Sequence, residues 1–487
     1  MSYLALDLGA GSGRAIVGTI QNNRIHLDEV HRVSNSPIKL GNTLYWDFLS
    51  LFENIKQGIS LAIKKGYNLK GIAVDTWGVD YGLIDKDGNL LSNPVCYRDC
   101  RTEGLSISST EHITKEELYN ITGIQQMDIN TIFQLWSMKK ANNPVLPITD
   151  KLLFTPDLIN YFLTGVSANE YTIASTSQLL DAQSRKWSDK IFNRLQLPVS
   201  IVSEIKQPCT LLGKLNDQIS VETGARNVNV FTVGSHDTAS AIAAIPENGD
   251  NWAFLSSGTW SLLGILNEKP ILTQEAMVND FTNEGGVNDK ILFMRNITGL
   301  WLLQRLILEW EEKGLNSSYE YILSEAAKAK PFRSIVDSDD PAFTHPVSMT
   351  KAMQDYCFQT GQPSPETQGE LVRCILESLA IKYYHVMEKL KECSDRSFSK
   401  LYVVGGGSQN SQLNQFIANS LNIEVVTGIS EATVVGNIVQ QAITDKTISG
   451  WTQAHTIIGN SFDFKSYHPE NTHIWKEIVQ NTSHLFS

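Results

Sequence analysis

The sequence has little of what marks secreted, membrane or nucleic-acid-binding proteins. Six cysteines in 487 residues are too few for a disulfide framework, and no second Cys/His pair follows Cys96 and Cys100 at the spacing of a zinc site. No apolar run approaches the roughly 18 residues of a membrane helix, so we expect neither a signal peptide nor a membrane span. The 40 Lys and Arg against 52 Asp and Glu, a net charge of −12, argue against nucleic acid as a partner. We therefore expect a cytoplasmic protein.

The composition is that of a chain with a substantial core, at 42% hydrophobic and 19% charged residues. Short β-rich runs, among them 3–7, 15–20 and 25–33, alternate with longer helical patterns such as 370–390, which predicts an α/β fold. A glycine-rich turn between two predicted strands opens the chain, and a similar strand, turn and strand recurs over 252–266. The polar turn at 246–250 separates these halves. We therefore predict two domains, 1–245 and 246–487, of a duplicated fold.

The first motif with chemical potential is Asp7-Leu-Gly-Ala-Gly-Ser-Gly-Arg14. Closely spaced glycines free backbone N–H groups to converge on an anion such as a phosphate. A β-like run follows instead of a helix, which excludes a dinucleotide fingerprint, and the chain has no Walker-type loop. A carboxylate beside a phosphate loop requires a bridging cation, so Asp7 points to a Mg²⁺-nucleotide. The alternative is an ordinary glycine hairpin.

Three further motifs follow predicted strands. Gly405-Gly-Gly-Ser-Gln-Asn410 lets a flat or phosphorylated ligand approach the backbone before a helix, or is a structural turn. Asp237, in Ser235-His-Asp-Thr-Ala-Ser240, is either a helix N-cap or a general base, and His236 is a positioning or hydrogen-bonding group. Asp75 is either a carboxylate for the metal or a turn residue. Trp77 and Gly78 together suit a sugar.

These motifs, in this order, resemble those of the FGGY carbohydrate kinases of the actin-like ATPase superfamily. The resemblance runs from Asp7 to about Asn437. Its most specific segments, in chain order, are Asp75-Thr-Trp-Gly-Val-Asp80, Tyr97-Arg-Asp99, Ser235-His-Asp-Thr-Ala239, Leu255-Ser-Ser-Gly-Thr-Trp-Ser261, Thr282-Asn-Glu-Gly-Gly286, Gly299-Leu-Trp-Leu-Leu-Gln-Arg305 and Glu431-Ala-Thr433.

The resemblance implies a duplicated actin-like ATPase (ribonuclease H-like) α/β fold, with two domains and a central cleft. The N-terminal domain would bind the sugar and supply the base, and the C-terminal domain would bind the nucleotide. The implied activity is transfer of the ATP γ-phosphate, with Mg²⁺, to O1 of L-rhamnulose. The alternatives are L-fuculose or another ketose as acceptor, a non-enzymatic actin-like ATPase scaffold, and a sugar-sensing repressor, which would carry a basic helix-turn-helix arm.

The resemblance also implies a role for each matching residue. Asp237 is the expected catalytic base. The expected sugar contacts are Gly78, His236, Asp237, Thr238 and Asn296. The expected nucleotide contacts are Ala10, Gly11, Ser12, Gly13, Arg14, Thr259, Gln304 and Gly406. Asp7 and Asp75 are expected to hold Mg²⁺ directly or through water. Gly11 stands where related kinases usually have Ser, so one hydroxyl donor to phosphate is absent while the backbone cradle remains. We expect a monomer or homodimer.

Overall fold

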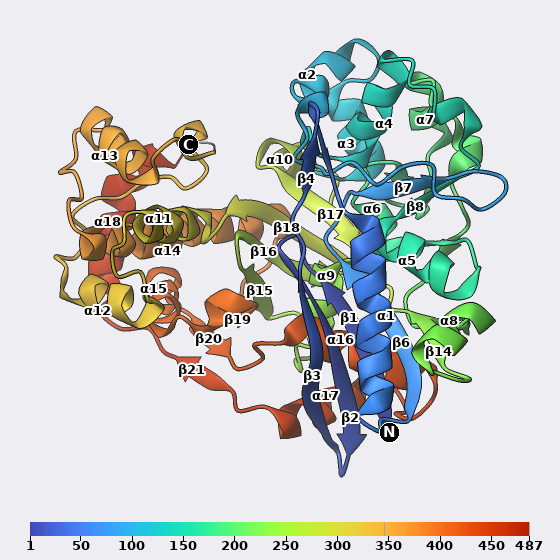
Figure 1. Cartoon of the computed structure of the whole chain (residues 1–487). Coiled ribbons are helices and arrows are strands. Elements are labelled where there is room, and N and C mark those ends of the chain that lie inside the picture. The colour runs from blue at the N-terminus through green and yellow to red at the C-terminus, as the bar shows by residue number, and fades with distance from the viewer. Residues whose placement is uncertain (345, 487) are drawn as a thin grey trace. The chain divides into compact units, whose positions relative to one another are not determined.

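The computed structural model of the chain describes residues 1–344 and 346–486 and contains two compact units (Figure 1). Unit 1 is built from Met1–Asn248, Leu266–Phe293 and Glu431–Phe462. Unit 2 is built from Gly249–Ile265, Met294–Ser430 and Asp463–Ser487. Each unit is therefore assembled from segments that are far apart in the sequence.

A mixed sheet with the strand order β13-β14-β6-β1-β2-β3 forms the centre of unit 1. Its strands are β1 (Ser2–Leu8), β2 (Ser12–Gln21), β3 (Arg24–Ser34), β6 (Leu69–Thr76), β13 (Thr210–Lys214) and β14 (Asn229–Thr232). Strands β1, β6 and β14 run parallel, whereas β2, β3 and β13 pair antiparallel with their neighbours. The carboxyl ends of three parallel strands therefore meet at one edge of the sheet.

Alternation along β1 decides what each face of this sheet packs against. Leu4, Leu6 and Leu8 share one hydrophobic cluster with residues of α1 (Phe48–Lys64) and α5 (Thr155–Thr164). The opposite face packs on α9 (Asp237–Ala243) and α16 (Ala432–Thr444), where the hydroxyl of Tyr3 donates to Asp445. Figure 1 shows α1 in front of this sheet and α16 behind it. Asp7 shares the alternation of Tyr3 and therefore lies on the α9 and α16 side.

The rest of unit 1 consists of short strands and further helices. The strands are β4 (Ile38–Leu40), β5 (Thr43–Tyr45), β7 (Tyr81–Ile84), β8 (Lys151–Phe154), β9 (Asn169–Glu170), β10 (Leu180–Asp181), β11 (Lys186–Trp187), β12 (Ile205–Lys206) and β17 (Phe281–Gly285). The helices are α2 (Leu105–Ser108), α3 (Lys115–Thr122), α4 (Thr131–Lys140), α6 (Tyr171–Ser175), α7 (Asp189–Arg194), α8 (Asp217–Thr223), α10 (Gln274–Val278) and α17 (Trp451–Ser461).

The sheet of unit 2 repeats the arrangement of unit 1 in the strand order β18-β16-β15-β19-β20-β21. The strands are β15 (Trp252–Ser257), β16 (Trp260–Asn267), β18 (Ile291–Thr298), β19 (Lys400–Val404), β20 (Glu424–Thr427) and β21 (Lys465–Tyr467). Strand β15 forms an antiparallel hairpin with β16 and runs parallel to β19, which runs parallel to β20. Strands β1, β2, β6 and β14 have the same relationships in unit 1, which confirms the expected duplicated fold.

Helices cover the sheet of unit 2 and supply its largest hydrophobic surface. They are α11 (Trp301–Glu312), α12 (Tyr319–Lys328), α13 (Met349–Gln359), α14 (Gln368–Ser394), α15 (Ser411–Leu421) and α18 (Thr472–Thr482). The longest, α14, begins at a capping box in which Thr367 and Glu370 satisfy each other's backbone N–H groups. Its buried residues include Leu376, Leu379 and Tyr383, so this helix lies in the core.

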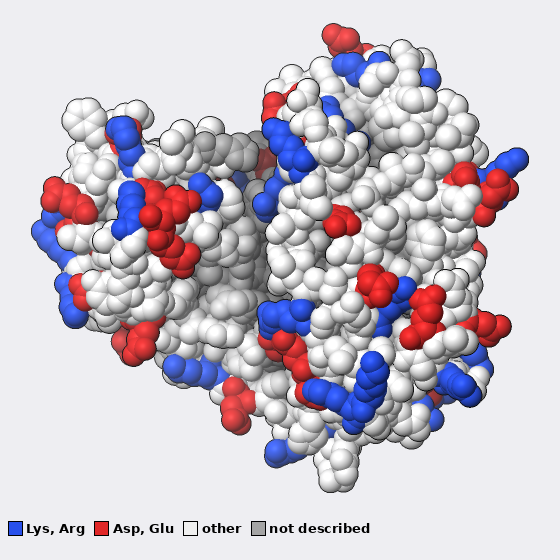
Figure 2. Space-filling model, viewed as in Figure 1, with Lys and Arg blue, Asp and Glu red and all other residues white. Residues whose placement is uncertain are grey.

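The surface carries side chains of both charge signs, as the 40 basic and 52 acidic residues lead one to expect. On the described residues of the face drawn in Figure 2, basic and acidic side chains are interspersed. Cys96, Cys100, Cys209, Cys357 and Cys374 form no disulfide bond in the structure. Within residues 1–344 and 346–486, no helix has the length and apolar character needed to cross a membrane.

Candidate functional site

Two carboxylates lie side by side where β1 and β6 end. Asp7 and Asp75 are direct partners in the parallel register of these strands. Asp75 is fully buried, and its Oδ2 accepts from Asn437 Nδ2 over 2.6 Å. Its Oδ1 has no hydrogen-bond donor among the described residues. Burial first, and then the nearby charge of Asp7, raise the pKa of Asp75 well above its usual range. The pair is thus an electrostatically unfavourable arrangement that a cation would stabilise.

Arg14, on β2, supplies one positive charge to this edge of the sheet. Its guanidinium pairs with Asp7, its register partner across the β1–β2 hairpin, and with Glu431 at the start of α16. Two carboxylates from distant parts of unit 1 therefore hold the arginine, and it is about one-fifth exposed.

The turn between β1 and β2 is a tight hairpin with an open outer side. Gly9 N donates to Ser12 O over 2.9 Å, which closes the turn. Asn35, the residue after β3, fixes the turn by donating from its side chain to Gly9 O and from its backbone N–H to Gly11 O. Gly11 is exposed, and a Cβ on it would meet no atom within 4 Å. The turn is therefore an ordinary hairpin whose backbone is open to solvent at Gly11. The hairpin and the expected phosphate cradle do not exclude each other.

The loop that follows β14 is fixed to both neighbouring strands and to α16. Thr76 N donates to Ser235 O over 2.8 Å, and Gly234 N donates to Gln440 Oε1 over 2.7 Å. The hydroxyl of Ser240 donates back to Gly234 O over 2.6 Å. This segment is held so closely that a Cβ on Gly436 would lie 1.8 Å from Ser240 O. The residues that follow in the loop, His236 and Asp237, therefore have a defined place.

Asp237 is the first residue of α9 and not its N-cap, a position taken by His236. Its Oδ1 accepts from the backbone N–H of Thr238 over 2.6 Å, whereas an N-cap side chain bonds to the second or third helical N–H group. The side chain is one-third exposed, so a substrate can reach it. Burial of the remainder raises the pKa of Asp237, the charge of His236 lowers it and the charge of Asp7 raises it. The structure therefore leaves this carboxylate available for acid–base chemistry.

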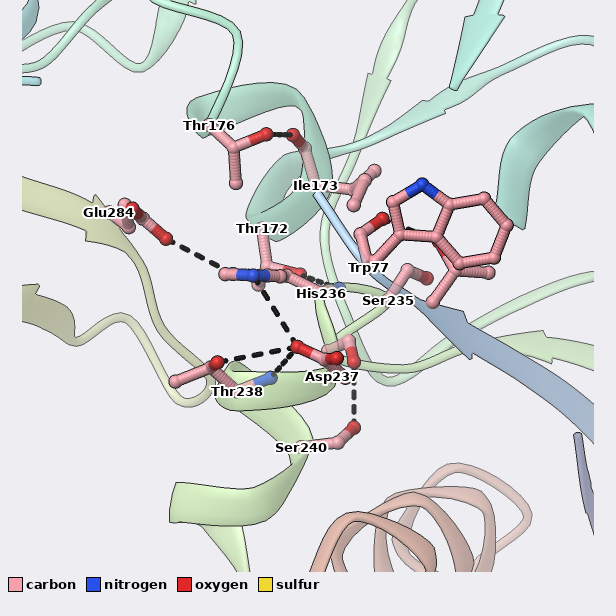
Figure 3. Close-up of polar contacts among 12 residues, drawn as sticks. Trp77, Thr172, Ile173, Thr176, Ser235, His236, Asp237, Thr238, Ser240 and Glu284 are labelled. Carbon is pink, nitrogen blue, oxygen red and sulfur yellow. Dashed lines mark hydrogen bonds and ion pairs between the residues drawn. The ribbon is translucent and has the colours of Figure 1, made fainter. Parts of the chain in front are cut away.

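His236 lies between two carboxylates, as Figure 3 shows. Its Nδ1 is 3.0 Å from Glu284 Oε2, and its Nε2 is 3.5 Å from Asp237 Oδ1. Gly78 lies beside this ring, because a Cβ there would be 3.5 Å from His236 Nε2, an ordinary contact, and 3.3 Å from Thr176 Oγ1. The structure thus brings Gly78, His236, Asp237 and Thr238 together in unit 1.

Trp77 does not offer its face to a ligand. It is buried at 6% exposure, packs against Trp46 with ring centroids 4.5 Å apart and donates from Nε1 to Asp80 over 2.9 Å. Asp80 also accepts from Trp46 Nε1 over 2.6 Å and, because it is fully buried, its pKa is raised to about 6. Asp80 therefore fixes the indole rings of Trp46 and Trp77, and Trp77 contributes to the packing of unit 1.

The remaining candidates lie in unit 2. The hydroxyl of Thr259, in the β15–β16 turn, donates to Gln304 Oε1 on α11 over 2.9 Å. Gly406 is exposed after β19, and a Cβ there would meet nothing within 4 Å. Gly405 before it has φ of +81°, and a Cβ there would lie 2.7 Å from Ser257 O. Asn296 is half-buried on β18.

The expected nucleotide contacts are therefore divided between the units. Ala10 to Arg14 lie in unit 1 with the sugar-side residues, whereas Thr259, Gln304 and Gly406 lie in unit 2 with Asn296. Five of the candidates in unit 1 lie in or just after strands of its central sheet. Asp7 and Asp75 lie near the ends of β1 and β6, Arg14 lies near the start of β2, and His236 and Asp237 come after β14.

Sequence reasoning missed the residues that hold these groups. Glu284, Asn437 and Gln440 contact His236, Asp75 and the 233–236 loop, respectively. Glu284 belongs to the Thr282-to-Gly286 segment that we used as a family motif, which was the available signal. Asn437 and Gln440 lie three residues apart on α16, and nothing local to β6 or β14 points to them.

Comparisons with known proteins cover nearly the whole chain. The model of the FGGY family of carbohydrate kinases, N-terminal domain, matches residues 2–244, and the C-terminal domain of that family matches 253–444. A rhamnulokinase of Bacteroides thetaiotaomicron is 41% identical over 474 residues, 97% of each chain. Rhamnulokinases of Oceanobacillus iheyensis and Bacillus subtilis are 38% and 35% identical over 95% and 97% of this chain and 97% and 96% of theirs.

Solved structures are similar in fold at low identity. A ligand-bound xylulose kinase from Lactobacillus acidophilus has a TM-score of 0.82 at 14% identity, covering 99% of this chain and 97% of that one. The Plasmodium falciparum glycerol kinase with ADP has a TM-score of 0.80 at 16% identity with the same coverage. These two structures support the two-domain fold alone.

Proposed function

This chain belongs to the FGGY family of carbohydrate kinases, and we propose that it transfers the γ-phosphate of ATP to O1 of L-rhamnulose. The observation that carries the choice of substrate is the identity of 35–41% to the rhamnulokinases described above, over nearly the full length of both chains. The observation that supports the chemistry is the one-third exposed carboxylate of Asp237 beside His236.

Asp237 is the proposed catalytic base. It accepts the proton of the O1 hydroxyl as that oxygen attacks the γ-phosphorus, and the bond from phosphorus to the bridging oxygen of ADP breaks. Phosphoryl transfer needs positioning and charge neutralisation more than covalent help, so a base held in place by His236 and Thr238 suits the reaction. Gly78, His236, Thr238 and Asn296 are the proposed sugar contacts.

The proposed nucleotide contacts are of two kinds. The Ala10-to-Arg14 turn offers open backbone and the guanidinium of Arg14 to phosphate oxygens. Thr259, Gln304 and Gly406 offer a hydroxyl, an amide and an uncovered backbone in unit 2. We assign the base, the phosphate turn and the sugar contacts other than Asn296 to residues 1–245, and Asn296 with the rest of the nucleotide contacts to 246–487.

The acidic edge of unit 1 fits a magnesium ion. Asp7 and Asp75 are adjacent oxygen donors, and Asp75 Oδ1 is buried without a partner among the described residues. No group of three or more acidic, His or Cys side chains that could hold a metal occurs in residues 1–344 and 346–486. That agrees with Mg²⁺, which proteins usually hold through one or two carboxylates, water and substrate phosphate. Bound there, the ion would neutralise charge on the transferring phosphate.

The proposal extends to location and assembly. Six cysteines in 487 residues are too few for a disulfide framework, which suits a reducing compartment, and we propose the cytoplasm. The expectation of a monomer or homodimer stays a prediction.

Coupled ADP-release assays on the purified full-length chain test the function. We expect Mg²⁺-ATP turnover with L-rhamnulose to exceed that with L-fuculose and D-xylulose in kcat/KM by at least about tenfold, which corresponds to about 1.4 kcal/mol of discrimination. A higher kcat/KM with either of the other ketoses would overturn the substrate. ATP hydrolysis that no ketose stimulates would favour the ATPase scaffold instead.

A further inference from the structure

Glu284 is the residue of unit 1 whose position the proposed chemistry leaves unexplained. It lies on β17, and its carboxylate is only 9% exposed. Its Oε2 is 3.0 Å from His236 Nδ1, on the side of the ring opposite Asp237 (Figure 3). Glu284, His236 and Asp237 thus form a chain of carboxylate, imidazole and carboxylate that ends at the one-third exposed base.

A ring between two carboxylates has a preferred protonation state. Neutral imidazole has one N–H donor and one bare nitrogen, so one of the two carboxylates would face a lone pair. The imidazolium instead presents positive charge to both carboxylates, with Nδ1 3.0 Å from Glu284 Oε2 and Nε2 3.5 Å from Asp237 Oδ1. Burial alone lowers the pKa of His236, but the hydrogen bond and charge of Glu284, followed by the charges of Asp237 and Glu170, raise it to about 8. Glu284 is therefore the main partner that keeps the ring charged.

The backbone around this chain is fixed, so the contact is built into unit 1. Before Glu284, Asn283 N and Nδ2 both donate to Gly123 O, over 2.8 and 3.0 Å. After it, Gly285 N donates to Ser175 Oγ over 2.7 Å. The backbone N–H of His236 donates to Thr172 Oγ1 over 3.1 Å. Side-chain and backbone bonds on both sides of the pair therefore set the distance between Glu284 and the ring.

The charge balance around Asp237 shows why a fixed cation matters. Burial and the charge of Asp7 raise the pKa of Asp237, and Asp75 is a further acidic neighbour. The charge of His236 opposes these effects. A base must be ionised to accept a proton at neutral pH, so the imidazolium serves the base directly.

We propose that Glu284 is a positioning residue of the kinase reaction, which fixes the ring of His236 and holds it as an imidazolium beside Asp237. The proposed effect of Glu284 on catalysis rests on the proposed function. The proposed effect of Glu284 on the protonation of His236 does not, so these two effects are tested by separate measurements.

The first test follows the His236 signal by NMR in the full-length, ligand-free protein with isotope-labelled histidine, assigned by comparison with His236→Asn. In Glu284→Gln we expect the apparent pKa of His236 to fall by at least about one unit, because the carboxylate charge is lost while the side-chain shape is kept. The matched control is Glu268→Gln, which removes a 73% exposed carboxylate paired with Lys290 and should leave the signal unchanged. An unchanged pKa of His236 in folded Glu284→Gln overturns the proposal.

The second test measures kinetics with the ketose that the protein turns over best. In Glu284→Gln we expect kcat to fall by at least about tenfold while the KM for ATP is unchanged, and the alkaline limb of the kcat–pH profile to move to lower pH, because His236 loses its proton at a lower pH. Glu284→Asp keeps the charge on a shorter side chain and should recover part of both kcat and the His236 pKa, also where Glu284→Gln folds poorly.

The outcomes separate the two proposals. Unchanged kcat and pH profile in a variant with a lowered His236 pKa would overturn the role of Glu284 in catalysis. Absence of ketose turnover in the unsubstituted protein would overturn the proposed function, while the NMR result still decides what Glu284 does to His236.

Discussion

Asn437 donates to Asp75 over 2.6 Å, although 362 residues separate the two in the sequence. Asn437 in turn accepts from Gln441 Nε2 over 2.7 Å, and Gln441 also donates to Leu4 O. Side chains of α16 thus reach the middle of β1 and the end of β6. The acidic edge of unit 1 is therefore completed by a segment from the last sixth of the chain.

Asp237→Asn should lower kcat by at least about a hundredfold, because an amide cannot take up the hydroxyl proton. Ketose binding, measured by calorimetry, should largely persist, and the melting temperature should change little since the amide oxygen still accepts from Thr238 N. The control is Asp189→Asn, an exposed aspartate at the same first position of α7, which should keep full activity. Retained turnover together with lowered stability in Asp237→Asn would assign the residue to helix stability alone.

Gly406→Ala should raise the KM for ATP by about tenfold while the ketose KM is nearly unchanged. The new methyl group meets no protein atom within 4 Å, so the protein should fold normally and the effect should come from space that the nucleotide needs. Gly405→Ala is the contrasting variant. Its φ of +81° and the approach of its Cβ to Ser257 O should cost about 1–3 kcal/mol of stability. An unchanged ATP KM in stable Gly406→Ala would remove Gly406 from the nucleotide contacts.

The stability of unit 1 should depend on pH through Glu170. This carboxyl is fully buried, and burial raises its pKa from 4.5 to about 7. Between these values the folded chain keeps a proton that the unfolded chain releases, so the free energy of unfolding falls as the pH rises from 4.5 to 7. The loss from this group is up to about 3 kcal/mol.

Urea unfolding across that pH range tests the contribution of Glu170. Glu170→Gln keeps the acceptor for Ile173 N and Ser235 N but does not titrate, so its stability should fall less steeply with pH. Glu204→Gln, at a 71% exposed side chain, should keep the slope of the unsubstituted protein. Parallel curves for the unsubstituted protein and Glu170→Gln would contradict the prediction.

Lys382→Met should destabilise unit 2 by about 3–5 kcal/mol. The Lys382 ammonium is 5% exposed and lies 2.7 Å from Asp337 and 2.9 Å from Asp339. Its removal leaves Asp337 without this cation and Asp339 with Arg295, 4.0 Å away. Lys389→Met removes a 45% exposed partner of Glu392 and should cost less than about 1 kcal/mol. Equal stability losses in the two variants, measured by urea unfolding, would contradict the importance of burial.

Much of the fold follows from local sequence pattern. The expected strands at 3–7, 15–20 and 25–33 are β1, β2 and β3, and the expected helix over 370–390 lies within α14. These elements have strong apolar periodicity and are bounded by turn residues, so local information suffices. The recurrence of a glycine hairpin at 252–266 correctly indicated the duplication because each half repeats the same strand relationships.

Local pattern did not decide what side chains at the strand ends do. Asp237 was compatible with an N-cap or a base, and only the backbone geometry places it one residue inside α9. Trp77 was expected to suit a sugar, but it packs on Trp46, because the indole N–H finds its partner in the buried Asp80. In both cases a tertiary contact decides between two locally acceptable roles.

The residues that support the site were beyond local reasoning. Residues 266–293 and 431–462 belong to unit 1 through Glu284, Asn437 and Gln440, whose partners lie between 48 and 362 residues away. Propensity and spacing carry no information about such pairings. The assignments of individual residues to sugar, nucleotide and metal stay predictions.

The division of unit 1 into three chain segments has a consequence for biosynthesis. A ribosome makes the strands of its sheet first and α16 near the end, so the nascent unit has one face of the sheet without its covering helix for most of translation. During that time Tyr3, Ala73 and Phe231, all buried in the finished chain, are open to solvent or to chaperones. A ribosome that stops before residue 431 therefore releases an aggregation-prone fragment, and folding of this unit is completed only close to chain release.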